Sequence, residues 1–308
     1  MMNDMIEFLK NEGVSPDLVR EVQEFADVHP ASEKFSGRVP VPKFYYYGRK
    51  IWEEALAVLL CGKNLLLTGE KATGKNVLAE NLSAAFGRPA WDISFHVNMD
   101  AASLIGTDTF ADGRVMFRPG PVYCCAQNGG FGILDEINMA RNEALAVLHS
   151  ALDFRRVIDV PGYERIPLAE STRFIATMNY NYAGTRELNE ALASRFVVIQ
   201  MPAASQADLQ RILSDQFPDM TEKYNDQFTM LFLDFRKKCE NGELTEKAMD
   251  LRGMLDAISL MRKGIAAREA LTLGITNKIF DSYEQELISD MIAARIPSKL
   301  KVSEVFKK

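Results

Sequence analysis

The central part of the chain alternates short apolar runs with amphipathic segments. Apolar runs occur at residues 65–68, 131–134 and 173–178, and polar residues follow each of them. Short apolar runs of this kind are typical of strands buried on both faces of a parallel sheet. Between the first two runs, apolar residues recur at helical spacing over residues 77–86, and Gly87 is placed to end that helix. The pattern predicts an α/β fold with a parallel sheet, whose ligands bind at the carboxyl ends of the strands.

Two shorter segments have the pattern of β-hairpins. Residues 110–115 enclose Asp112-Gly113, and residues 157–166 enclose Pro161-Gly162. Both dipeptides are turn signals, so we expect two hairpins that project from the sheet. Beyond Pro202 strand signals fade, and the remaining apolar periodicity is helical.

The N-terminal residues carry a third pattern. Two short helical patterns lie within residues 1–34, and Pro16 suits the first turn of the second helix. Pro40 and Pro42 fix φ and remove N–H donors, which favours an extended linker. The chain is therefore predicted to divide into residues 1–37, 38–202 and 203–308.

Composition narrows the class of protein. With 47% hydrophobic and 25% charged residues the chain is typical of globular proteins, and its net charge of -6 does not favour binding to nucleic-acid backbones or anionic lipid. The four cysteines lack C-x-x-C spacing, which favours reduced thiols. No apolar run approaches a membrane span, and the first residues lack the basic flank of a signal peptide. We expect a cytoplasmic protein with no membrane partner.

The first apolar run continues into a phosphate-binding pattern. Residues 69–76 match G-x-x-x-x-G-K-[ST] at every defined position except the last, where Asn76 stands in place of Ser or Thr. Backbone N–H groups of such a loop converge on phosphate oxygens, and Lys75 would reach the β- and γ-phosphates. The residues expected to bind ATP are Gly69, Glu70, Lys71, Ala72, Thr73, Gly74, Lys75, Asn76 and Val77.

A second element follows the second apolar run. Asp135 and Glu136 are adjacent acids at the end of a predicted strand. Asp135 would hold Mg²⁺ through water, with Asn76 as a second metal ligand, and Glu136 would polarise the attacking water. The loop and the acidic pair occur in the required order, with a helical crossover between them, and this predicts binding of ATP and Mg²⁺.

Four segments together resemble a known family. They are residues 69–76, residues 133–138, Thr177-Met178-Asn179 and residues 184–196, which read G-T-R-E-L-N-E-A-L-A-S-R-F. Their order resembles the successive motifs of AAA+ ATPases, most closely the dynein-related, MoxR-type group and its CbbQ/NorQ/NirQ branch. The resemblance covers about residues 38–265.

This resemblance implies an architecture and an assembly. Residues 38–202 would form an αβα nucleotide-binding core with two hairpin inserts, and residues 203–308 a helical lid. Residues 1–37 would be an N-terminal helical appendage and linker. Members of the family assemble as rings, usually hexamers, with ATP at the interfaces between subunits.

The resemblance also implies roles for single residues. Lys75 is similar to the Walker A lysine, Asp135 and Glu136 to the Walker B pair, and Asn179 to the sensor that orients the water. Arg195 is similar to the arginine finger, which acts in trans on the nucleotide of the neighbouring subunit.

Arg252 resembles the second sensor, which lies in the lid of the family. Its expected role, like that of Arg195, is catalytic.

Two residues of the loop depart from the family pattern. Asn76 replaces the hydroxyl that normally ligates Mg²⁺, although an amide oxygen can also ligate a hard cation. Ala72 replaces a frequent glycine. Because the backbone of the loop and Lys75 are retained, we expect ATP binding to survive and hydrolysis to be slow.

Three functions are compatible with these features. The first is a ring-forming chaperone or activase of the MoxR type that acts on a protein client, for which the resemblance implies a von Willebrand factor A domain partner. The second is an ATP-dependent assembly switch with little hydrolysis, which Asn76 favours. The third is a nucleic-acid-associated motor, against which the acidic net charge weighs.

Overall fold

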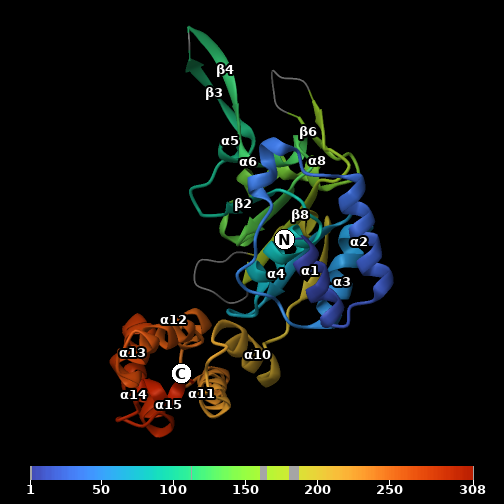
Figure 1. The fold of residues 1–308 in the computed structure, drawn as a ribbon. Helices are drawn as coiled ribbons and strands as arrows, with labels where there is room; N and C mark the ends of the chain where they lie inside the picture. Colours follow the sequence, from blue (N-terminus) through green and yellow to red (C-terminus); the bar gives the residue numbers. More distant parts are fainter. Residues whose placement is uncertain (1, 112, 160–164, 180–186, 308) are drawn as a thin grey trace. The chain divides into compact units, whose positions relative to one another are not determined.

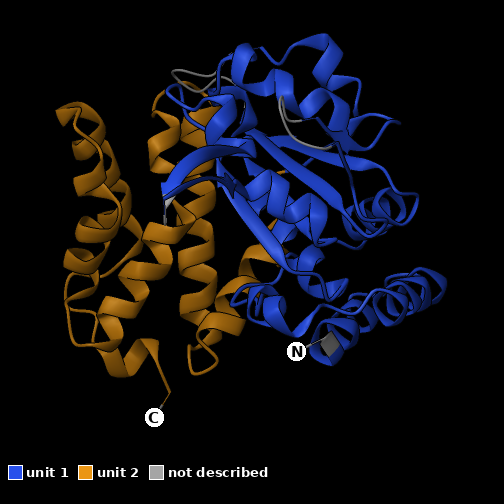
Figure 2. Cartoon of the chain, turned by 90° about the horizontal axis from the view of Figure 1, so that it is seen from above, with its two compact units in different colours: residues 1–202 blue, residues 203–308 orange. Residues whose placement is uncertain are grey.

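The computed structural model describes residues 2–111, 113–159, 165–179 and 187–307. The predicted turn at Pro161-Gly162, the hairpin residue Asp112 and the start of the motif at residues 184–186 lie outside these ranges. The chain forms two compact units, Met1–Pro202 and Ala203–Lys308, which are coloured separately in Figure 2 and described separately below.

The centre of unit 1 is a parallel sheet (Figure 1). Five strands lie in the order β2-β5-β8-β1-β9, and every neighbouring pair is parallel. The strands are β1 (Asn64–Gly69), β2 (Ala90–Ser94), β5 (Phe131–Asp135), β8 (Arg173–Asn179) and β9 (Phe196–Gln200). This confirms the predicted α/β fold with a parallel sheet.

Helices cover both faces of this sheet. Since successive side chains of a strand point to opposite faces, Leu65 and Leu67 enter one hydrophobic cluster and Leu66 enters another. The first cluster is built with α1 (Met2–Asn11), α2 (Pro16–Val28), α3 (Arg49–Leu60) and α4 (Lys75–Ala85). The second is built with α5 (Ala101–Ile105), α6 (Pro121–Gln127), α7 (Asn142–Leu145), η3 (Ala146–Leu148), α8 (His149–Leu152) and α9 (Glu190–Ala193).

The two N-terminal helices contribute directly to this core. Met5 and Leu9 of α1 and Val22 of α2 are almost fully buried, in the same cluster as Leu65. A short 3-10 helix, η1 (Glu33–Arg38), then leads into extended chain at Val39. Residues 2–28 are therefore part of the core of unit 1.

Two antiparallel strand pairs stand apart from the main sheet. β3 (Gly106–Ala111) pairs with β4 (Arg114–Pro119), and in Figure 1 this hairpin extends away from the sheet. β6 (Val157–Ile158) pairs with β7 (Ile166–Pro167). Both pairs occur where the sequence predicts hairpins.

Unit 2 is built from helices. They are α10 (Gln206–Gln216), α11 (Glu222–Glu240), η4 (Glu246–Ala248), α12 (Leu251–Arg262), α13 (Ala267–Gly274), η5 (Thr276–Lys278), α14 (Ser282–Arg295) and α15 (Val302–Val305). A capping box between Ser205 and Asp208 begins α10. Helices α12 and α13 approach closely at two glycines: a Cβ on Gly253 would lie 2.2 Å from the carbonyl oxygen of Gly274. Among the helices that the structure describes, none combines the length and apolar character needed to cross a bilayer.

Candidate functional site

The loop between β1 and α4 has a backbone that requires glycine at both ends. Gly69 has φ +151°, and a Cβ there would lie 2.9 Å from the carbonyl oxygen of Met201. Gly74 has φ +83°, and its Cβ would lie 3.0 Å from the ring of Tyr46. Both glycines therefore allow a turn that other residues could not adopt without displacing a neighbour.

Ala72 holds a left-handed conformation in the middle of this loop. Its φ is +62°, in the region where a Cβ meets the following carbonyl oxygen. For a residue other than glycine this conformation costs about 1–2 kcal/mol. The loop thus keeps the backbone shape that glycine would favour, at the expense of local strain.

Lys75 turns back over the loop from the first position of α4. Only 6% of its surface is exposed. Its Nζ donates hydrogen bonds to the carbonyl oxygens of Gly69 (3.0 Å) and Glu70 (2.6 Å) and to Oγ1 of Thr73 (3.2 Å). The ammonium group is therefore held at the centre of the turn.

The two acids at the end of β5 meet this loop. Nδ2 of Asn76 donates to Oδ2 of Asp135 over 2.9 Å. Thr177, on the neighbouring strand β8, donates from Oγ1 to Oδ1 of Asp135 (2.5 Å) and accepts from the backbone N–H of Glu136 (3.1 Å). Both oxygens of Asp135 thus accept hydrogen bonds from groups at the carboxyl edge of the sheet.

Glu136 is held beside them in a strained conformation. Its φ is +54°, so the chain turns sharply directly after β5. Asn179, which is the register partner of Gly69 in the sheet, donates from Nδ2 to Oε1 of Glu136 over 3.2 Å. Asn138 donates in turn to the carbonyl oxygen of Asn179 over 3.1 Å. The structure therefore brings Lys75, the acidic pair and the residues around them to one edge of the sheet.

An open groove of about 650 Å³ lies next to Asn76 and Asp135. Residues 37–41 form part of its wall, and Glu80 and Asp92 add two carboxylates. Burial, together with the charge of Asp135, raises the pKa of Asp92, while burial and the charge of Asp92 raise that of Glu80. Within the described ranges, no group of three or more His, Cys, Asp or Glu residues is arranged to hold a metal ion.

Arg195 lies at the opposite edge of the same sheet. It directly precedes Phe196, which pairs with Asn64 at the start of β1, whereas the loop begins at Gly69, where β1 ends. Five residues of strand separate the two ends, a distance of roughly 16 Å at about 3.3 Å per residue. Arg195 is therefore not brought to the loop of its own chain.

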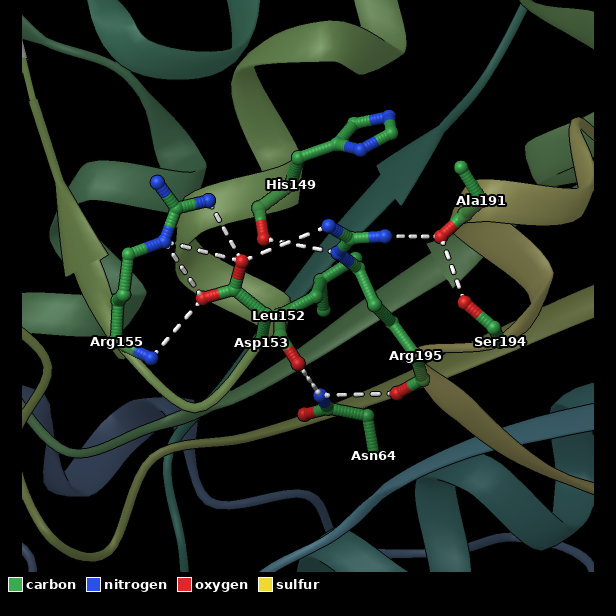
Figure 3. A network of polar contacts seen from close by, with 8 residues as sticks. All are labelled: Asn64, His149, Leu152, Asp153, Arg155, Ala191, Ser194 and Arg195. Carbon is green, nitrogen blue, oxygen red and sulfur yellow. Dashed lines mark hydrogen bonds and ion pairs between the residues drawn. The ribbon is translucent and has the colours of Figure 1, made fainter.

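The side chain of Arg195 is held by its own chain at that edge (Figure 3). Its Nε donates to the carbonyl oxygen of His149 over 3.1 Å, and Nη1 donates to the carbonyl oxygen of Ala191. Its Nη2 lies 3.5 Å from Oδ2 of Asp153. Burial and the charge of Arg195 lower the pKa of His149.

Arg252 belongs to unit 2 and is exposed in the first turn of α12. The helix begins at Asp250, whose Oδ1 accepts from the N–H of Gly253 over 3.0 Å and whose Oδ2 lies 2.6 Å from Nζ of Lys278. Arg252 is thus described only within its own unit.

Two polar side chains at these edges received no role from the sequence. Thr177 contacts both acids at the end of β5, and Asp153 contacts Arg195. Thr177 could have been found, because it lies two positions before Asn179 and so faces the same side of β8. The position of Asp153 had no comparable signal, since its contact with Arg195 spans distant parts of the sequence.

Comparisons with known proteins give the family. Residues 64–196 match the family of AAA domains described as the dynein-related subfamily. This segment begins with β1 and ends with the first residue of β9, so it contains the loop, the acidic pair, Asn179 and Arg195.

Similar proteins extend over more of the chain. The uncharacterized protein YojN of Bacillus subtilis is 33% identical over 267 residues, which is 85% of this chain and 88% of that protein. An uncharacterized protein of Staphylococcus haemolyticus is 33% identical over 248 residues, 79% of this chain and 94% of its own. A crystal structure of a Cytophaga hutchinsonii protein covers 92% of this chain and 89% of its own, at 17% identity and a TM-score of 0.45. On the sequence match over residues 64–196, this chain belongs to the AAA+ ATPases, in their dynein-related subfamily.

Proposed function

We propose that this protein binds and hydrolyses ATP as a ring, in the cytoplasm, and that it remodels or activates a protein client in the manner of MoxR-type ATPases. The observation that carries the proposal is the division of the proposed machinery between two edges of one sheet. Lys75 and the acidic pair lie at the carboxyl edge, and Arg195 lies at the amino edge. A complete site then requires the amino edge of a second copy.

ATP would bind across the loop and the start of α4. The N–H groups of residues 69–77 and the positive end of the helix dipole favour phosphate oxygens. The ammonium of Lys75, now hydrogen bonded to two loop carbonyls, would exchange these neutral acceptors for phosphate oxygens. An ammonium group beside a phosphate oxygen also gains the attraction between opposite charges, which a neutral carbonyl does not supply.

The residues present fit a magnesium ion. An ionised carboxylate only accepts hydrogen bonds, so the amide of Asn76 must direct its NH₂ group to Asp135. Its oxygen Oδ1 then remains as a neutral ligand beside the carboxylate of Asp135. Mg²⁺ commonly takes one or two protein ligands together with substrate phosphates and water, which agrees with so small a donor set. When bound, the ion would neutralise charge that develops on the phosphates.

Glu136 would act as the group that polarises the attacking water. Asn179 fixes one oxygen of its carboxylate, and Thr177 fixes its backbone N–H. With one carboxylate oxygen oriented, the other can accept a proton from water aligned with the γ-phosphate. The positive φ of Glu136 adds strain at the turn that carries this carboxylate.

Arg195 would stabilise the transferred phosphoryl group in the neighbouring subunit. A trans-acting arginine contributes about 10³–10⁵ in rate in related reactions. Arg252 would act as the second sensor from the lid, which we propose on the family resemblance of Asp250-Leu251-Arg252-Gly253. A hexameric ring and a von Willebrand factor A domain partner are proposed on the same ground.

The client role is supported by the β3–β4 hairpin. Phe110 and Val115 are register partners near its turn, and 77% and 67% of their surfaces are exposed. Paired apolar side chains at the end of a projecting hairpin can contact apolar segments of another polypeptide. They therefore form a candidate client contact.

A second candidate is an assembly switch in which ATP binding matters more than turnover. The amide at position 76 and the strained Ala72 favour it, since both depart from the residues that the family uses in this loop. In such a switch ATP would stabilise the ring, and hydrolysis would only reset it.

Steady-state ATPase assays combined with light scattering test these proposals. We expect turnover that is abolished by Glu136→Gln, and a ring that forms with ATP in both proteins. ATP-dependent assembly with equal, background turnover in the two proteins would favour the switch. A protein that neither assembles nor turns over ATP would exclude both candidates.

A further inference from the structure

The geometry at the amino edge of the sheet points to Asp153 as a positioning residue for Arg195, holding its guanidinium group for action on the nucleotide of a neighbouring copy. This inference rests on the proposed trans role of Arg195. It assigns a function to a residue that lies far from the phosphate loop of its own chain.

Three contacts fix the plane of the Arg195 guanidinium. They come from the carbonyl oxygen of His149 in α8, the carbonyl oxygen of Ala191 in α9 and the carboxylate of Asp153, directly after α8. A planar group with acceptors on three nitrogens has little freedom to rotate. Two helices and one carboxylate together set its orientation, as Figure 3 shows.

These contacts restrain the guanidinium but leave some of its N–H donors for another partner. It has five N–H donors. Within the described part of the chain, Nε and Nη1 each donate one hydrogen bond to a carbonyl oxygen, and Nη2 forms the ion pair with Asp153. With one N–H of Nη2 directed to Asp153, each terminal nitrogen of the guanidinium retains one N–H donor. The side chain of Arg195 is partly exposed, at 21% of its surface. Such a pair of donors suits the oxygens of a phosphoryl group.

Asp153 is itself held rigidly. Arg155 donates to it from Nε (3.1 Å to each oxygen), from Nη2 (2.6 Å to Oδ2) and from the backbone N–H (2.9 Å to Oδ1). Only 12% of the Asp153 side chain is exposed. A carboxylate locked in this way presents Oδ2 to Arg195 in a fixed direction, so its charge orients the guanidinium as well as attracting it.

Without Asp153, the two backbone contacts would restrain the orientation of the Arg195 guanidinium less. The carbonyl oxygens of His149 and Ala191 are neutral acceptors, whereas Asp153 is the one charged partner of Arg195 within the described ranges. The contact with Asp153 joins two opposite charges, so it adds an electrostatic attraction that the two carbonyl contacts lack. Loss of the charge should therefore loosen the guanidinium while the fold around it persists.

Mixed rings separate this role from a structural one. One chain of the ring, called the acceptor chain, carries Arg195→Ala and keeps its own hydrolytic residues. The other, called the donor chain, carries Glu136→Gln and keeps Arg195, which it supplies to the acceptor chain. The two chains carry different affinity tags, so that only mixed rings are purified. Asp153→Asn is then placed in the donor or in the acceptor, with Asp17→Asn, which alters an exposed ion pair in α2, as the matched control.

We expect Asp153→Asn in the donor to lower kcat by about 10- to 100-fold, the range that follows from misplacing a catalytic group. The KM for ATP should change by less than about twofold, since the acceptor site is intact. The same change in the acceptor, which has no Arg195 to position, should leave kcat unaltered, as should the Asp17 control. Asp153→Glu in the donor, which keeps the charge, should retain more activity than Asp153→Asn and serves if the Asn variant does not fold.

Equal losses from Asp153→Asn in donor and acceptor would show a structural role and overturn the inference, as would no loss in either. Mixed rings that are inactive with Asp153 intact in both chains would instead refute the trans role of Arg195, on which the inference rests. The two failures are therefore distinguishable in one set of assays.

Discussion

Nδ2 of Asn76 lies 2.9 Å from Oδ2 of Asp135 and donates a hydrogen bond to it. In the family pattern a Ser or Thr hydroxyl occupies this position, where it can donate to the carboxylate and offer an oxygen to the metal. The amide divides the same two tasks between its nitrogen and its oxygen. Asn76 can therefore supply both groups that the proposed metal site needs at this position.

Asn76 should matter for hydrolysis more than for ATP binding. Asn76→Thr keeps a donor and an oxygen, so we expect at least the wild-type kcat and a lower Mg²⁺ concentration at half-maximal rate. Asn76→Leu removes both and should lower kcat by about tenfold or more, in line with loss of one metal contact. ATPase rates over a Mg²⁺ titration measure this, and nucleotide affinity without Mg²⁺ is the control. Equal Mg²⁺ dependence in all three proteins would exclude Asn76 as a metal ligand.

Thr177 should hold Asp135 and Glu136 in position at the end of β5. Thr177→Val keeps the shape but removes the hydroxyl that contacts Asp135 and the N–H of Glu136, so we expect a lower kcat and a loss of about 1–3 kcal/mol in the free energy of unfolding. Thr68→Val, which removes a 3.4 Å contact to the carbonyl oxygen of Ile199 on β9, is the matched control. Denaturant unfolding and ATPase assays give both quantities. If the two variants lose kcat equally, Thr177 has no special part in the site.

The strain at Ala72 predicts a stabilising substitution. Ala72→Gly relieves a left-handed φ of +62°, partly offset by the greater freedom of glycine in the unfolded chain, and should raise the free energy of unfolding by up to about 1 kcal/mol. Ala293→Gly, at an exposed position of α14, should lower it by about 1 kcal/mol. Opposite signs of the two changes in urea unfolding support the assignment, and a loss of stability at both positions contradicts it.

The ion pairs of Asp153 predict a pH dependence of stability. Hydrogen bonds from the Arg155 side chain hold the pKa of Asp153 at about 2, below its ordinary value of 3.8. A depressed pKa in the folded state stabilises the protein above the unfolded-state pKa and loses this effect as pH falls through the folded-state value. The stability difference between the wild type and Asp153→Asn should thus be constant from pH 7 to about 4 and shrink toward about pH 2. Chemical unfolding over that range measures it, and a constant difference throughout would contradict the ion-pair account.

Much of the fold could be predicted from local pattern. Strands β1, β5 and β8 lie in the middle of the sheet and are continuous apolar runs, because both of their faces are covered. The outer strands β2 and β9 were not predicted. Both expose some of their side chains, so their short, interrupted apolar patterns carry less signal.

The candidate site could be predicted where the chemistry is local in sequence. The loop, Asp135-Glu136 and Asn179 each stand at the end of a strand, and parallel pairing brings such ends together. The contact between Asp153 and Arg195 depends on tertiary packing, and so does the burial of Met5 and Leu9 in the core. The contact has no motif signal in the sequence, and the helical pattern within residues 1–34 predicts a helix without identifying the surface that buries it.

The trans action of Arg195 is the central claim, and the ATPase activity of mixed rings made from two inactive variants tests it most directly. Arg195→Ala and Glu136→Gln should each be inactive alone. When the two variants are mixed at random in equal amounts, half of the sites have an intact Glu136, and half of these face an intact Arg195. Activity should therefore return to about a quarter of the wild-type value. Mixed rings that stay inactive, or an Arg195→Ala protein that hydrolyses ATP at the wild-type rate by itself, would contradict the account.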